Sequence, residues 1–241
     1  MSPSAEPEQV RPHAPATIDE ELLGTKRRAV LPTQTEQERI ARIDRDLEAG
    51  FAALRELGPA VTFFGSARVA PDHPYYARSR EAARRVGGEG FAIITGGGPG
   101  LMEAANRGAR DAGVTSVGLN IELPFEQAPN PYQDIALTCS YFFTRKMMFV
   151  RYATAFVVLP GGFGTLDELF EALVLEQVDK IRDFPIILVG VAYWGGLVAW
   201  IRERLLAEGM IAEGDARLLM VTDDVDEVAR AVCRARAVQE V

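Results

Sequence analysis

Seven short apolar runs, separated by stretches of helical periodicity, constrain the fold of this chain more than any other feature of its sequence. Each run has about the length of a buried strand. The runs are Val61–Phe64, Phe91–Thr95, Thr115–Leu119, Ile135–Thr138, Phe156–Leu159, Ile186–Val189 and Leu218–Val221. The stretches predicted as helices are Tyr75–Val86, Leu101–Ala112, Phe143–Tyr152, Leu166–Val178, Leu197–Glu208 and Val225–Ala235. Strands that are apolar on both faces and alternate with helices form a mostly parallel sheet, so we expect a doubly wound, Rossmann-like α/β fold.

The chain before the first apolar run divides at about residue 33. Residues 1–33 are rich in Pro, Glu, Gln and Ala, and we expect them to form a flexible tail that takes no part in chemistry. From Thr35 onward, apolar residues recur at three- and four-residue steps, Thr35 and Glu38 have the spacing of a capping box, and Gly58-Pro59 ends the pattern. We therefore predict one Rossmann-like nucleotide-binding domain over residues 34–241, with an N-terminal helix over residues 34–58.

The composition excludes several classes of function. A formal net charge of −8 disfavours DNA or RNA as a partner, whereas backbone N–H groups and a few local arginines can still bind a small phosphorylated ligand. Cys139 and Cys233 belong to no metal or redox motif, and His13 and His73 are the only histidines, so we expect no metal, no cofactor and no histidine-based triad.

The sequence also predicts where the protein resides. The N-terminal residues contain no apolar run of the kind found in a signal peptide or membrane anchor. The most apolar stretch, Pro185 to Trp200, is interrupted by Gly190, Gly195 and Gly196 and does not resemble a membrane span. We predict a cytoplasmic protein without a membrane partner.

Three turns that follow predicted strands carry the residues of chemical interest. In open α/β sheets, ligands bind beyond the carboxyl ends of the strands. Gly65-Ser66 follows the first strand, Gly96-Gly97-Gly98 follows the second, and the third turn is Pro160-Gly161-Gly162-Phe163-Gly164-Thr165-Leu166-Asp167-Glu168. The last two turns each open a helix, where free backbone N–H groups and the helix dipole favour an anion.

These turns do not match the common nucleotide fingerprints. The dinucleotide pattern needs a third glycine at position 101, after Gly96 and Gly98, but Leu101 stands there. A Walker A loop needs Lys between its last glycine and the following Ser or Thr, but Thr165 follows Gly164 directly. NAD and ATP chemistry are therefore disfavoured.

The third turn resembles the Pro-Gly-Gly-x-Gly-Thr-x-x-Glu motif of the Lonely Guy family. These proteins are cytokinin riboside 5′-monophosphate phosphoribohydrolases, many of them labelled lysine decarboxylases. The family's Arg-Lys-x-x-Met element is similar to Arg145-Lys146-Met147-Met148-Phe149, although the methionine stands at 148 and not at 149. With the Gly65-Ser66 and Gly96-Gly97-Gly98 turns included, the resemblance covers roughly residues 60 to 225.

The resemblance implies hydrolysis of the N-glycosidic bond of a nucleoside 5′-monophosphate, a cytokinin riboside monophosphate or AMP, to free base and ribose 5-phosphate. It implies Arg145 and Glu168 as the catalytic pair. We expect the substrate to bind at Gly65, Ser66, Gly96, Gly97, Gly98, Met102, Glu103, Lys146, Pro160, Gly161, Gly162, Phe163, Gly164 and Thr165. A decarboxylase is disfavoured, because no lysine has a convincing pyridoxal-phosphate context.

Physical chemistry supports a catalytic role for Glu168 independently of the resemblance to the family. Breaking a glycosidic bond builds positive charge on the ribose, and an ionised carboxylate beside the sugar stabilises that charge. The structural alternative is that Thr165 and Glu168 form a capping box. Arg145 also has a structural alternative, as a solvated residue on a helix face. The individual roles of the two residues are not decided by the sequence.

Two other functions are alternatives to the enzyme. One is a binding protein of the same fold that holds a nucleotide or phosphorylated cofactor without hydrolysing it, as molybdenum-cofactor carriers do. The other is a DNA-handling protein of the DprA-like fold, which the net charge disfavours. The resemblance also implies a homo-oligomer, a dimer or an assembly of dimers. The identity of the base is left open, and the loop over Glu122–Tyr132 is a candidate gate for it.

Overall fold

The strands of the chain form one parallel sheet, in a computed structural model that describes residues 14–24, 33–123 and 128–239. The strands are β1 (Ala60–Phe64), β2 (Ala92–Thr95), β3 (Ser116–Ile121), β4 (Ile135–Cys139), β5 (Ala155–Val158), β6 (Ile186–Val189) and β7 (Leu219–Thr222). Their order is β4-β3-β2-β1-β5-β6-β7, and every neighbouring pair is parallel. The predicted α/β fold with a doubly wound sheet is confirmed.

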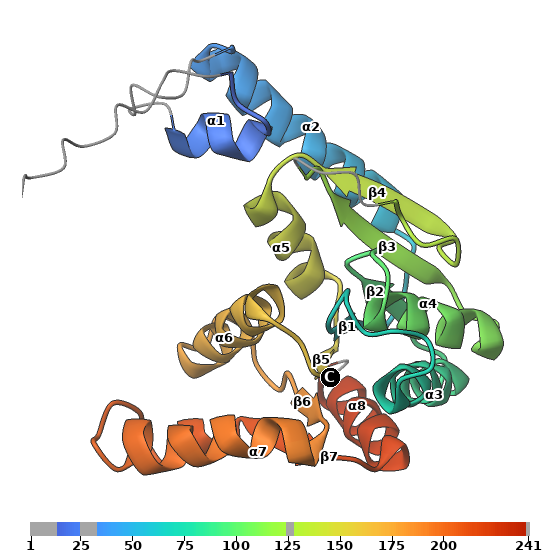
Figure 1. The fold of residues 1–241 in the computed structure, drawn as a ribbon, viewed down its shortest axis with the longest axis vertical. Coiled ribbons are helices and arrows are strands. Elements are labelled where there is room, and N and C mark those ends of the chain that lie inside the picture. Colours follow the sequence, from blue (N-terminus) through green and yellow to red (C-terminus); the bar gives the residue numbers. More distant parts are fainter. Residues whose placement is uncertain (1–13, 25–32, 124–127, 240–241) are drawn as a thin grey trace, which may run out of the picture.

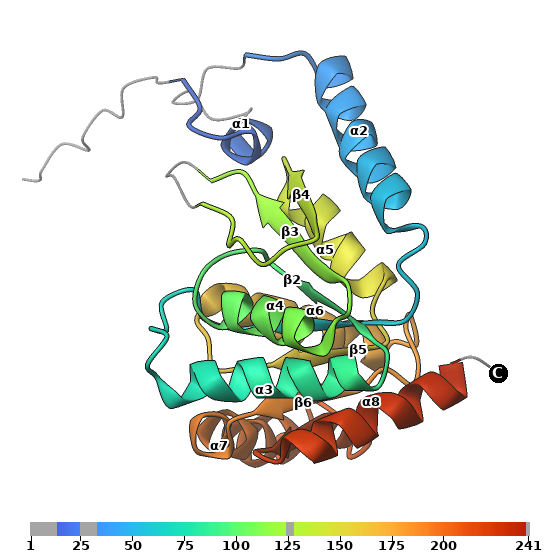
Figure 2. The same cartoon turned by 90° about the vertical axis from the view of Figure 1, so that its right-hand side faces the viewer.

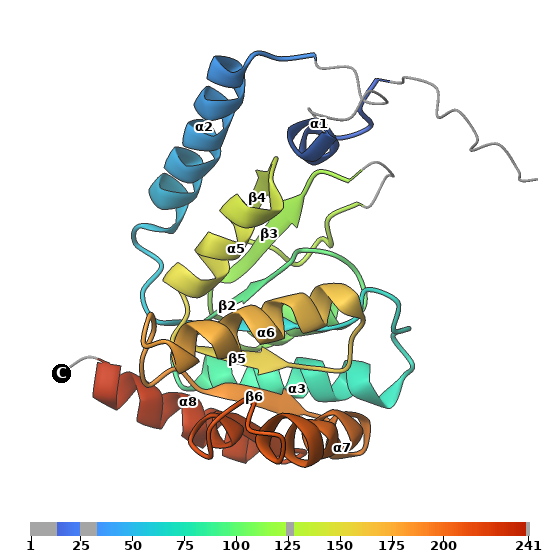
Figure 3. The same cartoon turned by 90° about the vertical axis from the view of Figure 1, so that its left-hand side faces the viewer.

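Helices cover both faces of this sheet (Figures 1, 2 and 3). On one face lie α3 (Pro74–Gly88), α4 (Leu101–Ala112) and α8 (Val225–Gln239), and on the other lie α5 (Phe142–Arg151), α6 (Phe163–Gln177) and α7 (Val191–Trp200). Alternate strand residues divide between the two cores: Val61 and Phe63 of β1 pack on the first face, and Phe64 packs on the second. Burial on both faces explains why the strands read as continuous apolar runs.

The predicted N-terminal helix is present as α2 (Glu36–Leu54). Its capping box is complete: the Thr35 side chain accepts a hydrogen bond from the Glu38 N–H, and the Glu38 carboxylate accepts one from the Thr35 N–H at 2.7 Å. α2 packs beside α5, where a Cβ atom on Gly50 would lie 2.4 Å from Cε of Met148. The glycine therefore allows the two helices to approach closely.

A short helix lies within residues 14–24, a part of the segment that the sequence predicted to be a flexible tail, while residues 1–13 and 25–32 of that segment lie outside the described residues. This helix is α1 (Ile18–Gly24), and its Glu21 is only 2% exposed. The Glu21 carboxylate accepts hydrogen bonds from Arg39 of α2 at 2.8 Å and from the Thr33 and Gln34 N–H groups. Burial alone would raise the pKa of Glu21, but these bonds outweigh it and lower the pKa to about 2. A buried, charge-paired residue thus helps to hold α1 against α2, through a contact that composition does not predict.

The helix expected over Leu197–Glu208 begins earlier than predicted. α7 begins at Val191 and continues through a π-helix, η1 (Ile201–Leu206), before the 3₁₀ helix η2 (Asp215–Arg217). Gly190, with φ of 120°, lets the chain turn directly from β6 into α7, and Trp194 on the first turns of α7 is buried against the sheet. No helix among residues 14–24, 33–123 and 128–239 combines the length and apolar character needed to cross a membrane.

Candidate active site

The three glycine turns meet where the direction of strand order reverses. The chain runs outward from β1 to β4, returns to β5 on the other side of β1, and then continues to β7. The turns after β1 and β5 are joined by a hydrogen bond from the Ser66 N–H to the Pro160 carbonyl oxygen at 3.0 Å. The Leu101 N–H donates to the Ser66 carbonyl at 3.0 Å and so joins the first turn to the second. This switch point is the place where open α/β sheets bind ligands.

The second turn is clamped from a distant loop. Gly97 has φ of 72°, and its carbonyl oxygen accepts hydrogen bonds from the Asn130 N–H at 2.9 Å and from the Gln133 side chain at 2.7 Å. The Asn130 side chain, which is 6% exposed, also donates to the Gly98 carbonyl and to Asn106. Sequence analysis did not single out Asn130, because an asparagine between two prolines is typical of any loop. The part of the suspected gating loop around Asn130 is thus fixed to the turn, while residues 124–127 lie outside the described residues.

The third turn presents the start of α6. Gly162 is the N-cap of this helix, and Thr165 is the first residue of α6 whose N–H bonds to a carbonyl, that of Gly162 at 3.0 Å. In the described part of the chain, no hydrogen bond engages the N–H groups of Gly162, Phe163 or Gly164. These donors and the helix dipole make the third turn suitable for an anion such as a phosphate.

The structural alternative for Glu168, a capping box with Thr165, does not fit this geometry. Thr165 is the third residue of α6 and not its N-cap, so Glu168 lies in the second turn of the helix. The Thr165 side chain packs instead against Gly161, where a Cβ atom would come within 2.0 Å of the Thr165 Oγ1. Capping therefore does not explain the carboxylate at position 168.

Glu168 is a buried carboxylate near the half-buried Arg145. Glu168 is 5% exposed. Burial raises the pKa of its carboxyl to about 7, although the charges of Arg145 and Lys146 act to lower that pKa. No ion pair within 4 Å joins Glu168 to Arg145 in the part of the chain that the structure describes. An acidic group that is buried with so little direct compensation is typical of catalytic sites.

Arg145 extends from α5 toward the second glycine turn. One of its terminal nitrogens, Nη1, lies 3.9 Å from the position that a Cβ atom of Gly96 would occupy. The guanidinium lies over the rings of Phe142 and Phe149 at 5.0 and 5.5 Å, and its buried Nε has no hydrogen-bond partner among the residues that the structure describes. Burial lowers the pKa of Arg145, while the charge of Glu168 acts to raise it. Arg145 is therefore not placed as a solvated surface residue.

Helix α1, which lies in the N-terminal segment expected to take no part in chemistry, contacts the start of α5. Asp19 of α1 accepts a hydrogen bond from the Phe142 N–H at the start of α5, at 3.1 Å. Burial raises the pKa of Asp19, and the nearby charge of Arg145 acts against that rise. α1 thus borders the helix that carries Arg145.

The remaining predicted site residues divide between the turns and other contacts. Met102 lies at the second turn, with its sulfur 2.8 Å from the position of a Cβ atom on Gly96. The Ser66 hydroxyl, at the first turn, accepts a hydrogen bond from the Arg68 N–H. Glu103, by contrast, accepts a hydrogen bond from the Tyr76 hydroxyl of α3 at 2.7 Å. Glu103 therefore points to α3 and not to Gly96.

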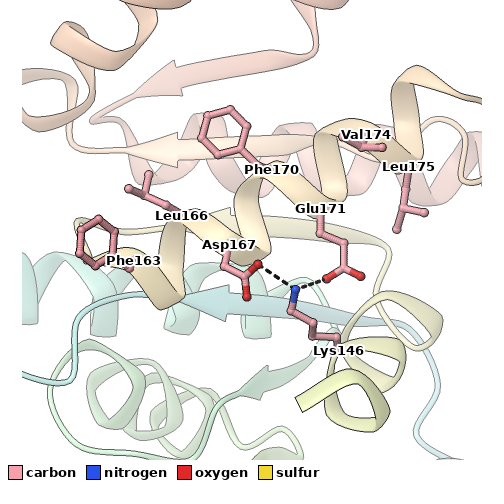
Figure 4. Close-up of a pocket in the computed structure, with 8 residues that line it drawn as sticks. All are labelled: Lys146, Phe163, Leu166, Asp167, Phe170, Glu171, Val174 and Leu175. Atoms are coloured by element: carbon pink, nitrogen blue, oxygen red, sulfur yellow. Dashed lines mark hydrogen bonds and ion pairs between the residues drawn. The ribbon is translucent and has the colours of Figure 1, made fainter. Parts of the chain in front are cut away.

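Lys146 of α5 lines a cavity of about 640 Å³ along α6 (Figure 4). Its ammonium group forms ion pairs with Asp167 at 3.0 Å and Glu171 at 2.9 Å, between α5 and α6. Burial would lower the pKa of Lys146, but these two partners outweigh it and raise the pKa. Lys146 is therefore held charged between two carboxylates.

Comparison with known proteins now identifies the relationship. The family model described as "Possible lysine decarboxylase" matches residues 102–232. A cytokinin riboside 5′-monophosphate phosphoribohydrolase of Mycobacterium tuberculosis is 34% identical over 167 residues, covering 66% of this chain and 87% of the relative. The rice protein of the same activity, named LOG, is 32% identical over 154 residues, covering 61% of this chain and 62% of the relative.

The chain belongs to the Lonely Guy family. Solved structures agree at the level of fold alone. A molybdenum cofactor carrier protein of Chlamydomonas reinhardtii has a TM-score of 0.56 at 23% identity and covers 74% of this chain and 98% of its own. A molybdenum cofactor binding protein of Rippkaea orientalis has a TM-score of 0.51 at 21% identity, covering 74% of this chain and 96% of its own.

The decarboxylase description of the Lonely Guy family model finds little support in the lysines of this member. Pyridoxal phosphate requires a lysine amine that can lose its proton to form a Schiff base. The sequence contains Lys26, Lys146 and Lys180. Lys146 is held charged by two carboxylates, Lys180 is exposed after α6, and Lys26 lies outside the described residues. The described residues also contain no group of three or more His, Cys, Asp or Glu side chains placed to bind a metal ion.

Proposed function

We propose that this protein hydrolyses the N-glycosidic bond of a nucleoside 5′-monophosphate, a cytokinin riboside monophosphate or AMP. Water adds to C1′ of the ribose, the bond from C1′ to the base nitrogen breaks, and the products are the free base and ribose 5-phosphate. The observation that carries this proposal is the buried Glu168 carboxylate at the switch point, whose charge the half-buried Arg145 compensates only in part. The activity that names the mycobacterial and rice relatives is the second support.

In this proposal the third turn binds the 5′-phosphate. The N–H groups of Gly162, Phe163 and Gly164 stand at the start of α6, and an anion there interacts favourably with the helix dipole. Glu168 is on the same helix, about one turn further on, so a phosphate at the third turn places the ribose near its carboxylate. The first and second turns, with Met102, then contact the remainder of the nucleotide.

Glu168 acts as the catalytic carboxylate in its ionised form. As the glycosidic bond breaks, positive charge develops on the ribose, and a buried carboxylate stabilises this charge more strongly than one in water. The same carboxylate can orient the attacking water. Arg145, which is half-buried and whose Nε has no hydrogen-bond partner among the described residues, supplies the positive charge that favours the ionised form of Glu168 when substrate fills the site.

The direct experiment is to incubate the purified protein with AMP and with the monophosphate of an N6-prenylated adenosine. We expect free base and ribose 5-phosphate in equal amounts, separated by chromatography, and no base from adenosine, which lacks the phosphate. Binding of AMP without any product would contradict hydrolysis and favour a non-catalytic nucleotide-binding protein.

We also propose that a second copy of the chain covers the outer face of α6. Phe163 and Val174 of α6 are 92% and 53% exposed, and the C-cap residue Val178 is 52% exposed. Phe163 and Val174 line the cavity that holds Lys146, together with Leu166 and Phe170 (Figure 4). A contiguous apolar stripe on a helix surface is typical of an interface between subunits.

A further inference from the structure

Tyr193 of α7 holds one peptide group of the third glycine turn. Its hydroxyl donates a hydrogen bond to the Gly161 carbonyl oxygen at 2.8 Å. The side chain is 48% exposed, so burial of the ring does not account for its position. We propose that Tyr193 is a positioning residue for phosphate binding, an inference that rests on the proposed function in taking the third turn as the phosphate site.

The orientation of the Gly161 carbonyl determines where the next N–H points. In a trans peptide, the C=O and N–H bonds of one peptide unit point in opposite directions, and no peptide bond in the described chain is cis. The Gly161 carbonyl is drawn toward α7, which follows β6. The N–H of Gly162 therefore points away from α7.

The preceding peptide unit is held in a similar way. The Pro160 carbonyl accepts the Ser66 N–H at 3.0 Å, so two consecutive carbonyls of the turn have donors from outside it. Gly161 and Gly162 have no side chains to restrict their backbone, and a free glycine turn samples many orientations. Fixing both peptide planes before the ligand arrives reduces the entropy lost on binding.

The start of α7 is anchored well enough for Tyr193 to perform this role. Trp194, the next residue, is 1% exposed in the core beneath α7. The Val191 N–H donates to the Asp223 carboxylate at 3.2 Å, after β7. Gly190 packs against Pro160, with Cγ of the proline 3.2 Å from the position of a Cβ atom on the glycine. The tyrosine thus extends from a fixed helix end that already touches the turn.

The test is Tyr193→Phe, which removes the hydroxyl and keeps the ring. Tyr75→Phe is the matched control, because Tyr75 also lies beside Gly190 and its hydroxyl has no hydrogen bond among the contacts of the described residues. Binding of ribose 5-phosphate, which cannot be hydrolysed, is measured by calorimetry for the wild type and both variants. We expect the Kd of Tyr193→Phe to rise about threefold to tenfold, the range for one lost hydrogen bond, and that of Tyr75→Phe to stay unchanged.

Kinetics with AMP separate positioning from a general structural effect. We expect Tyr193→Phe to raise KM by the same factor, to leave kcat within about twofold, and to melt at the wild-type temperature. An unchanged Kd for ribose 5-phosphate would overturn the role of Tyr193, as would a wild type that does not bind this ligand. A wild type that binds it, is weakened by Tyr193→Phe and yet releases no base from AMP would retain the inference and refute the proposed hydrolysis.

Discussion

At the scale of single residues, Glu168 combines two properties that a structural carboxylate seldom has together. It is buried, and the capping role open to it in the sequence is absent in the structure, because α6 begins at Phe163 and Gly162 is its N-cap. A buried carboxylate without direct ion pairing in the described chain lowers the stability of the fold. Under the proposed function, the same charge stabilises the transition state, which gives a reason for keeping a carboxylate at this position.

Replacing Glu168 by glutamine tests this use of charge. The amide preserves shape but cannot stabilise positive charge on the ribose, so we expect kcat with AMP to fall by about 100-fold or more. Glu171→Gln is the matched control, since Glu171 lies one turn further along α6 and pairs with Lys146. Base release from AMP is measured for both variants. Turnover by Glu168→Gln at the level of Glu171→Gln would contradict a catalytic role.

The raised pKa of Glu168 also predicts a pH dependence of stability. The carboxyl has a pKa of about 7 in the folded protein and its ordinary value of 4.5 when unfolded, so between these pH values the folded state holds a proton that the unfolded chain has lost. The stability that this proton contributes is complete below pH 4.5 and is lost as the pH rises through 7.

Glutamine does not ionise, so Glu168→Gln removes this dependence. We expect the free energy of unfolding of the variant, relative to the wild type, to increase by about 1–3 kcal/mol between pH 5 and pH 8. Urea denaturation of both proteins at the two pH values measures the difference. A relative stability that is the same at pH 5 and pH 8 would mean that Glu168 titrates normally in the folded state.

At the scale of elements, α4 links the first two glycine turns through its N-cap. Gly100 has φ of 67°, and a Cβ atom there would lie 2.4 Å from the Ser66 carbonyl oxygen. Gly113, at the other end of the same helix, has φ of 71° but has no atom within 4 Å of the Cβ position. The two glycines share a positive φ and differ in the close approach of a neighbouring backbone.

Alanine at these two positions separates the role of conformation from that of contact. Gly113→Ala is expected to cost about 1 kcal/mol of unfolding free energy, the usual penalty for positive φ. Gly100→Ala is expected to cost more and to raise KM for AMP, because the Ser66 turn must move. Chemical denaturation and steady-state kinetics on both variants provide the measurements. Equal losses of stability with an unchanged KM would show that the contact with Ser66 is unimportant.

Most elements of this fold were predictable from the sequence, and the departures have local physical causes. β1, β2, β5 and β6 were found because all their residues are buried, which gives each a continuous apolar run. The edge strand β4 was found from its apolar residues, although it alternates half-buried and exposed positions. α1 was missed because its position is stabilised by the contact of Glu21 with Arg39 of α2, and local composition does not predict a contact between residues so far apart in the sequence. The early start of α7 depends on the φ of 120° at Gly190, which the sequence marks only as an interruption.

The candidate site shows the same division between local and distant information. The glycine turns were predicted, because each directly follows an apolar run. The hydrogen bonds of Asn130 to Gly97 and of Tyr193 to Gly161 join residues more than 30 positions apart. Neither Asn130 nor Tyr193 belongs to a sequence motif that would predict such a contact. Lys146 and Glu103 were grouped with the turns by position in the sequence, but their side chains point to Asp167 and to Tyr76 respectively.

At the scale of the whole molecule, the two helical faces of the sheet differ in what they leave exposed. α6 has exposed apolar side chains along its surface: Phe163 and Val174, together with the C-cap residue Val178, are all more than half exposed. Figure 3 shows α6 in front of the sheet, on the face that is turned toward the viewer. Exposure of this apolar stripe to water is unfavourable at about 25 cal/mol per Å², so its burial favours association.

A charge introduced into this stripe is expected to disrupt association. Val174 on α6 is 53% exposed, and Val238 on α8 is 54% exposed but belongs to the opposite layer of helices. Because an unpaired carboxylate is costly to bury, Val174→Glu should shift the protein from a dimer or larger assembly to a monomer, whereas Val238→Glu should sediment like the wild type. Sedimentation velocity at micromolar concentration measures all three. A monomeric wild type would refute the interface altogether, and an assembled Val174→Glu would place the interface on another surface. Because the two valines are almost equally exposed, a difference between the two variants reports the location of the added charge and not the exposure of the residue replaced.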